Sequence, residues 1–262
     1  MSQPALASAI QHWVHGEIAI AARAPLLMVS GAQGIGKTTA LSTLADPRVV
    51  VLGLDDFYHT RQQRRLLAEQ VHPLCETRGA PGSHELTLLL RTIDGLQQAT
   101  ATSRVALPRF DKRLDDRVPV SDWGEFVGRP TAIILEGWML GALADPNAPF
   151  DEPVNALEAE QDPKGVWRAW QELELGQHYQ SLWTRADAFL HLDAPGFAVV
   201  ARWRLQQEAT IQGVDVDAVS AERCAWVAGF IQHFERITRR MLAGQRVAGT
   251  SIRLDADRVV IA

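Results

Sequence analysis

The sequence predicts an α/β protein with a central, mostly parallel five-stranded sheet flanked by helices. Short apolar runs, typical of strands that are buried on both faces, recur along the 262 residues. Between these runs lie segments in which apolar residues return every three or four positions, as they do on one face of a helix. Strands that alternate with helices favour a parallel sheet covered on both faces, which gives three layers in a single domain.

The individual elements follow from these patterns. Strands are predicted at residues 26–30, 49–54, 131–135, 188–192 and 251–254. Helices are predicted over about 5–24, 37–45, 61–70, 164–183, 196–210 and 217–243. Another helix is expected after Ser83, the predicted N-cap, because leucine and isoleucine residues follow it at helical spacing. Residues 105–130 and 141–163 are predicted to be loops, because they are rich in charged or polar residues.

Composition argues against several classes of protein. The net charge of −5 speaks against general nucleic-acid binding, which usually needs a basic surface. No apolar run approaches the eighteen or so residues that a membrane span needs, and the first residues lack the pattern of a secretion signal. We therefore expect a cytoplasmic protein whose two distant cysteines are reduced. The sequence leaves the oligomeric state open.

The strongest motif is Gly-Ala-Gln-Gly-Ile-Gly-Lys-Thr at residues 31–38, which fits the phosphate-loop pattern G-x-x-x-x-G-K-[ST] in full. Glycines let several backbone N–H groups point at one phosphate, and the helix that follows favours anions at its N-terminus. Lys37 is expected to reach the β- and γ-phosphates of ATP, and Thr38 to bind Mg²⁺. The residues predicted to bind nucleotide are Gly31, Gln33, Gly34, Ile35, Gly36, Lys37, Thr38 and Thr39.

Carboxylates follow two of the predicted strands. Asp55 and Asp56 end the second strand, and Glu136 ends the third. Ligands of open α/β sheets bind at the carboxyl ends of the strands, where a carboxylate can accept a hydroxyl proton or orient Mg²⁺. The residues alone do not rank Asp55 against Asp56 as the base. They predict a kinase that phosphorylates a hydroxyl of a small molecule, and no Asn-Lys-x-Asp string of a guanine-binding GTPase occurs.

A second group of residues indicates an anionic acceptor. The region between the second and third strands holds Arg78, Arg109, Lys112, Arg113 and Arg117. Arginine binds carboxylates through two parallel hydrogen bonds, and Arg78, set among glycines, is the preferred candidate. His84 either orients the substrate or caps a helix.

Several of these strings together resemble known families. The phosphate loop, Asp55-Asp56-Phe57-Tyr58 and Glu136-Gly137-Trp138 are similar in order and kind to the uridine kinase, phosphoribulokinase and pantothenate kinase group. Over residues 27–210 the chain looks more narrowly like the D-glycerate 3-kinase family of plants and microbes. The strings that carry this likeness are 78–85 (RGAPGSHE), 108–112 (PRFDK), 136–141 (EGWMLG), Asn155 and 202–206 (RWRLQ). Glu85 and Phe110 stand where the plant motifs have Asp and Tyr, residues 156–172 look expanded, and no plant transit peptide is expected.

The resemblance implies a three-layer P-loop kinase fold that uses ATP and Mg²⁺. It implies an acceptor-binding insert at about 58–130 and a lid at about 194–215. Asp55 would be the base, and Lys37 and the lid residue Arg202 would assist catalysis. Arg204 also lies in the lid, but helical spacing places it on another face than Arg202, so we do not expect both to reach the phosphates. The metal ligands would be Thr38, Asp56 and Glu136. The residues implied to contact the acceptor are Asp55, Tyr58, Arg78, His84 and Arg109. Open alternatives are a kinase of pantothenate or of a nucleoside, and a nucleotide-binding regulatory protein without an acceptor.

Overall fold

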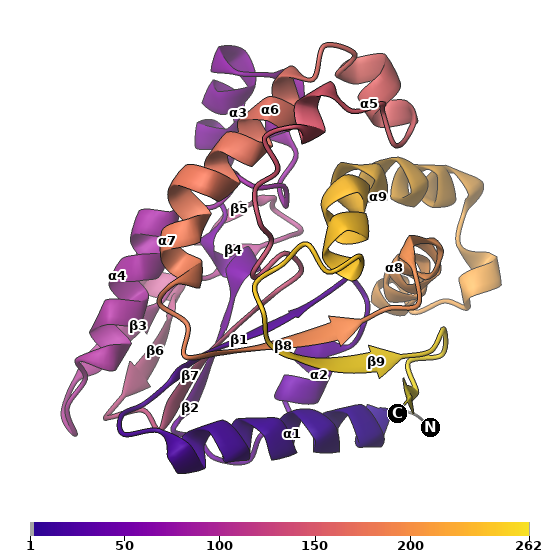
Figure 1. Ribbon diagram of the computed structural model, residues 1–262. Helices are drawn as coiled ribbons and strands as arrows, with labels where there is room; N and C mark the ends of the chain where they lie inside the picture. Colours follow the sequence, from indigo (N-terminus) through magenta and orange to yellow (C-terminus); the bar gives the residue numbers. More distant parts are fainter. Residues whose placement is uncertain (1–2, 262) are drawn as a thin grey trace.

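A six-stranded sheet runs through the middle of the molecule in the order β10-β9-β8-β1-β7-β2. The structure is a computed structural model that describes residues 3–261 (Figure 1). The strands are β1 Leu26–Gly31, β2 Val49–Gly53, β7 Ala132–Gly137, β8 Ala188–Asp193, β9 Thr250–Leu254 and β10 Val260–Ile261. The first five pair in parallel and confirm the five predicted strands, whereas β10 adds an antiparallel edge that was not predicted.

Helices cover both faces of this sheet (Figure 1). Their bounds are α1 Gln3–Ile20, α2 Lys37–Leu41, α3 Arg61–Gln70, α4 Leu86–Gln97, α5 Ala156–Gln161, α6 Val166–Glu174, α7 Gln180–Trp183, α8 Phe197–Gln212 and α9 Ala221–Leu242. A π-helical turn, Leu175–Tyr179, joins α6 to α7. Leu26 and Met28 of β1 pack with α4, α7 and α9, and the alternate residues Leu27 and Val29 pack with α1, α2 and α8. This alternation confirms the three-layer arrangement, because side chains of a strand point to opposite faces in turn. No helix within the described residues has the length and apolar character that crossing a bilayer requires.

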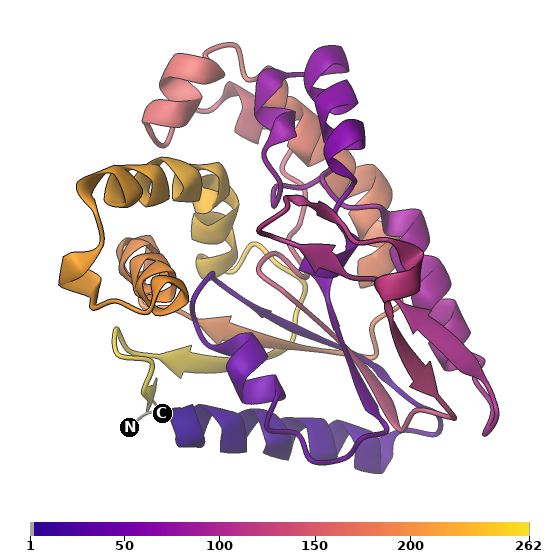
Figure 2. The same ribbon diagram turned by 180° about the vertical axis from the view of Figure 1, so that it is seen from behind.

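The insert between β2 and β7 is more ordered than predicted. Residues 105–130, expected to be loop, contain a hairpin-like pair of β3 Arg104–Leu107 with β6 Gly124–Val127 and a second pair of β4 Phe110–Asp111 with β5 Asp116–Arg117. The pair β3–β6 lies along α4 in both views (Figures 1 and 2). These strands escaped the sequence analysis because they are two to four residues long and carry charged residues.

Ser83 is not the N-cap of α4, so that prediction was wrong. Its hydroxyl accepts from Gly79 N at 2.9 Å and donates to Ala80 O at 2.6 Å. The next residue, His84, forms a bridge with Tyr58 that keeps the backbone extended. The helix therefore begins only at Leu86.

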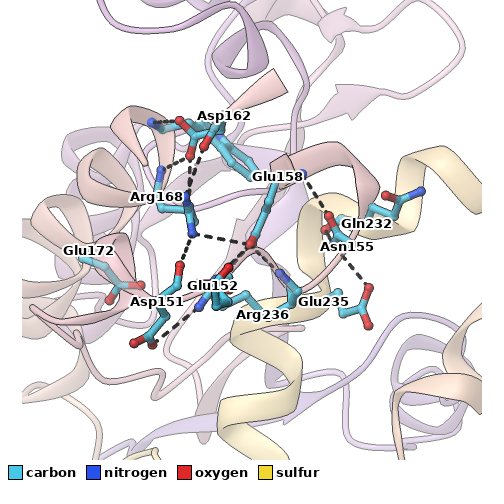
Figure 3. Close-up of polar contacts among 12 residues, drawn as sticks. Asp151, Glu152, Asn155, Glu158, Asp162, Arg168, Glu172, Gln232, Glu235 and Arg236 are labelled. Atoms are coloured by element: carbon cyan, nitrogen blue, oxygen red, sulfur yellow. Dashed lines mark hydrogen bonds and ion pairs between the residues drawn. The ribbon is translucent and has the colours of Figure 1, made fainter. Parts of the chain in front are cut away.

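A buried ionic cluster fastens α5 and α6 to α9 (Figure 3). Glu158, whose side chain is 2% exposed, lies 2.6 Å from Arg236 Nη2 and 3.8 Å from Arg168 Nη1. Arg168 Nε also lies 3.2 Å from Asp162. Residues 141–163 were predicted to be surface loop, but their acidic side chains neutralise arginines that lie inside. The cluster holds α9 in place, and α9 contributes Phe230 and Phe234 to the cavity described below.

Replacing the centre of this cluster should cost much of the stability. Glu158→Ala leaves Arg168 and Arg236 without their shared carboxylate, and breaking a buried pair in this way costs about 3–5 kcal/mol. Glu160 is exposed on the same helix, so Glu160→Ala should change the unfolding free energy by less than about 0.5 kcal/mol. Urea unfolding of both variants checks this expectation. Equal midpoints for the two variants would contradict it.

Candidate active site

A cavity of about 780 Å³ opens at the carboxyl ends of β1, β2 and β7. This is the edge at which open α/β sheets bind their ligands. The cavity brings together eleven of the residues predicted from the sequence. They are Gln33, Gly34, Gly36, Lys37, Thr38, Thr39, Asp55, Asp56, Tyr58, Arg78 and Glu136.

The phosphate loop connects β1 to α2 at the floor of this cavity. Lys37, the first residue of α2, is buried, and its ammonium donates to Gly31 O at 2.5 Å and Ala32 O at 3.2 Å. Burial lowers the pKa of Lys37, while the negative charges of Glu136 and Asp55 act against that shift. Ile35 is fully buried and belongs to the core cluster with α1, so its side chain holds the loop against the sheet rather than facing the cavity.

A hydroxyl and two carboxylates at this edge suit a magnesium ion. Thr38 Oγ1 donates to Glu136 Oε1 at 2.7 Å, and Asp56 lines the same cavity. Mg²⁺ is usually held by one or two carboxylates together with phosphate oxygens and water, rather than by a cage of protein ligands. Consistent with that habit, no group of three His, Cys, Asp or Glu side chains within residues 3–261 forms a complete metal site. The residues present therefore fit a magnesium ion that shares its coordination with a nucleotide.

Asp55 lies in the middle of the polar wall. Tyr58 Oη donates to its Oδ1 at 2.6 Å, and Lys112 Nζ donates to its Oδ2 at 2.6 Å. Burial alone would raise the pKa of Asp55. The charge of Lys112 and the two hydrogen bonds outweigh that effect and hold the pKa well below its usual range. Asp55 is therefore a carboxylate, the form that a proton acceptor needs.

Asp56 has a different environment from its neighbour. Its Oδ1 accepts from Phe110 N at 3.2 Å. Burial raises the pKa of Asp56, and the nearby charges of Asp55 and Glu136 add to the rise. A cation beside Asp56 and Glu136 would relieve this repulsion. The two neighbouring aspartates therefore differ: the pKa of Asp55 is lowered, whereas that of Asp56 is raised.

Two aromatic rings pack against the glycines of the Arg-Gly-x-x-Gly string at residues 78–82 and leave no room for a side chain there. Gly79 has φ +116°, and a Cβ there would lie 2.5 Å from the ring of Phe234. Gly82 has φ +84°, and a Cβ there would lie 2.1 Å from Trp170. Only glycine combines these dihedrals with such close packing. The rings thus fix the path of the turn that carries Arg78 to the cavity wall.

His84 supports the site from behind. It is buried and does not line the cavity; its Nδ1 lies 2.6 Å from Tyr179 Oη, and its ring stacks on Tyr58 at 4.7 Å between centroids. Burial lowers the pKa of His84 to about 3, so the imidazole is neutral at physiological pH. The N-cap of α4 is Glu85, which excludes the capping role, and the burial of His84 away from the cavity argues against the predicted contact with the acceptor. Its ring instead packs on Tyr58, which bonds Asp55.

Besides Gly31, Ile35 and His84, two more predicted residues do not line the cavity. Arg109 is exposed and does not line it. Arg202 bonds Ala256 O and pairs with Asp257 at 3.2 Å, which turns it toward the β9–β10 hairpin. Arg204 lies on another face of α8 and does line the cavity, 5.5 Å from the centre of the Phe230 ring. The structure therefore favours Arg204 over Arg202 as the lid arginine.

Two further charged residues line the cavity without having been predicted as site residues. Lys112 was noticed as a basic residue but not chosen, although it belongs to the 108–112 string that carries the family likeness. Arg258, which no motif marks, donates to Gly34 O at 2.7 Å and lies 5.0 Å over the Trp203 ring. Arg258 adopts φ +63° in the turn between β9 and β10. Through its bond to Gly34, this turn supports the phosphate loop.

The fold and the site define a P-loop kinase that uses ATP and acts on a small molecule. No protein-family model matches the sequence. The chain is 30% identical over 226 residues to the uncharacterized kinase mug58 of Schizosaccharomyces pombe. This match covers 80% of this chain and 78% of that protein. It is 29% identical over 197 residues to the chloroplastic D-glycerate 3-kinase of Arabidopsis thaliana, which covers 70% of this chain and 41% of that longer protein.

The chain belongs to the kinase family that contains these two proteins. Among solved structures, the D-glycerate 3-kinase of Cryptococcus neoformans matches with a TM-score of 0.78 and 22% identity. The match covers 98% of each chain. At that identity the likeness shows the shared fold, which here extends over nearly the whole chain.

Proposed function

We propose that this kinase transfers the γ-phosphoryl group of ATP to a hydroxyl of D-glycerate and forms 3-phosphoglycerate. The observation that carries the proposal is that Asp55, Arg78 and Lys112 share one cavity with the phosphate loop. A carboxylate can accept the hydroxyl proton there, while two cations suit an acceptor that bears an acid group. The activity in the name of the Arabidopsis relative is consistent with this chemistry.

The chain's own residues divide the work as follows. Backbone N–H groups of residues 34–38 hold the phosphates, and Lys37 and Arg204 neutralise the charge of the group in transfer. Asp55 accepts the proton of the attacking hydroxyl. Within one domain, residues 58–130 form the acceptor insert and residues 194–215 form the lid.

Thr38, Glu136 and Asp56 would hold the magnesium ion. When bound, it neutralises the β- and γ-phosphate oxygens. The 2.7 Å bond between Thr38 Oγ1 and Glu136 Oε1 supports this assignment, because both oxygens already converge on one point.

An acceptor panel tests the proposed substrate. ADP release is measured with D-glycerate, pantothenate, uridine and no acceptor, and ³¹P NMR of the product identifies the phosphorylated hydroxyl. We expect D-glycerate to give the highest kcat/KM and 3-phosphoglycerate to be the product. A wide preference for pantothenate or uridine would eliminate glycerate, and ATP binding without acceptor-stimulated ADP release would favour a regulatory protein.

The two lid arginines should differ strongly in their effect on turnover. Arg204→Ala removes a cation from the cavity wall, and loss of such a stabilising group typically costs about 10²- to 10³-fold in kcat. Arg202→Ala should cost far less, because Arg202 faces Ala256 and Asp257. Steady-state kinetics of both variants provide the measurement. A larger loss from Arg202→Ala would restore the assignment made from the sequence.

A further inference from the structure

The two partners of the Asp55 carboxylate differ in exposure. Tyr58, which donates to Oδ1, is 4% exposed, whereas the Lys112 side chain, which donates to Oδ2, is 56% exposed. Oδ1 is thus bonded by a buried side chain, and Oδ2 by a largely exposed one that lines the cavity. An incoming hydroxyl needs an Asp55 oxygen as its hydrogen-bond acceptor, and Oδ2 is the accessible one.

Lys112 begins the turn of the β4–β5 hairpin, whose base and last turn residue, Asp115, are tied to the rest of the protein. The base is tied by Phe110 N, which donates to Asp56, and by Arg117, which donates to Tyr58 O at 2.6 Å and to Glu85 at 2.7 Å. At the tip, the Arg113 side chain is 91% exposed. A lysine side chain on such a support can move its ammonium while its backbone stays in place.

The other cation near the acceptor is bound more firmly. Arg78 pairs with Asp115, which also pairs with the buried Arg64 at 3.0 Å, and the Arg78 guanidinium lies 5.8 Å over the Phe110 ring. Among the described residues Lys112 pairs with the carboxylate of Asp55 alone, and its side chain is 56% exposed, so other groups in the open cavity can compete for its ammonium. An acceptor that brings its own carboxylate can therefore exchange with Asp55 for Lys112 more easily than it can free Arg78.

We propose that Lys112 is the specificity-determining residue that recognises the acid group of the acceptor and uncovers the base in doing so; this rests on the function proposed above. The acceptor's carboxylate takes the Lys112 ammonium from Asp55, and Oδ2 becomes free for the attacking hydroxyl. That hydroxyl oxygen then forms its bond to the γ-phosphorus as the bond from phosphorus to the bridging oxygen breaks. ADP leaves, and the hydroxyl proton passes to Asp55 Oδ2.

This exchange also protects ATP. Water carries no carboxylate to draw Lys112 away, so the ammonium stays on Asp55 and the base does not activate water. An uncharged acceptor, like water, has no carboxylate that could take the Lys112 ammonium from Asp55. The lysine therefore links the chemical class of the acceptor to the readiness of the base.

The test compares D-glycerate with glycerol, which lacks the acid group. For Lys112→Ala we expect kcat/KM for D-glycerate to fall about tenfold or more through a raised KM, the size of a lost hydrogen bond to a charged group. The kcat/KM for glycerol should not fall, and ADP release without an acceptor should rise.

Lys112→Arg should keep the preference for D-glycerate. Arg113→Ala, one residue further along the hairpin, should behave as the wild type does, because Arg113 pairs with Asp111 outside the cavity.

Three outcomes would overturn the role of Lys112. They are an equal loss of kcat/KM for both acceptors in Lys112→Ala, an unchanged preference between them, and no rise in acceptor-independent ADP release. A wild-type enzyme that uses pantothenate instead of D-glycerate would overturn the proposed substrate alone, and the same comparison would then be made with pantothenate and pantothenyl alcohol. A wild-type enzyme that prefers glycerol or uridine would overturn both.

Discussion

Lys37→Ala should abolish measurable phosphoryl transfer while leaving the fold intact. Its ammonium lies against the phosphate loop at Gly31 O and Ala32 O, within reach of the charges of Asp55 and Glu136. A cation that stabilises the transferred phosphoryl group is worth about 10³- to 10⁵-fold in kcat. Burial already disfavours the charge of Lys37, so its removal should not lower stability much. Coupled ADP-release kinetics and a thermal melt measure the two effects.

Lys164→Ala is the matched control, because Lys164 is exposed in the turn between α5 and α6, outside the cavity. It should retain wild-type turnover. Both variants should melt within about 3 °C of the wild type, the shift that about 1 kcal/mol produces in a chain of this size. Retained turnover in Lys37→Ala would remove this lysine from the mechanism.

Asp55→Asn should reduce kcat by about 10²- to 10⁴-fold, the usual contribution of a general base. ATP affinity should change far less, because Asp55 faces the acceptor side through Tyr58 and Lys112. Asparagine keeps the shape of the side chain but cannot take up the proton. Kinetics with varied D-glycerate and separate measurement of nucleotide binding distinguish the two effects.

Asp56→Asn distinguishes the two neighbouring aspartates. Asp56 accepts from Phe110 N and is proposed to hold Mg²⁺ together with Glu136. Because Asp56→Asn removes a carboxylate from that proposed site, the variant should need more Mg²⁺ for half-maximal rate. A titration of rate against Mg²⁺ shows the difference. If Asp56→Asn lost as much turnover at saturating Mg²⁺ as Asp55→Asn does, the base assignment would move to Asp56.

Strands β1, β7 and β8 could be predicted because strands buried on both faces must be apolar throughout, as Leu26 to Val29 are. The edge strand Val260–Ile261 could not, because two apolar residues carry no period. The buried Glu158 and Arg168 could not be foreseen either. Charged residues such as these are expected at the surface. Their burial becomes understandable only when Arg236, 78 residues from Glu158, is known to lie beside them.

The candidate site also contains residues that could be predicted from the sequence and residues that could not. Lys37, Asp55 and Glu136 lie at the ends of strands or in a loop, where sequence order fixes their place at one edge of the sheet. Arg202 and Arg204 are two positions apart on one helix, and only the packing of α8 decides which of them reaches the cavity. Helix periodicity separates their faces but does not say which face meets the nucleotide.

The contact between Arg258 and Gly34 imposes an order on how the enzyme is assembled. The two residues are 224 positions apart, yet the guanidinium donates to a carbonyl of the glycine-rich loop. During synthesis, the ribosome therefore completes nearly the whole sheet before that loop acquires its brace. A nascent chain that already contains the entire glycine-rich motif would still lack the hydrogen bond that holds Gly34 in its native place.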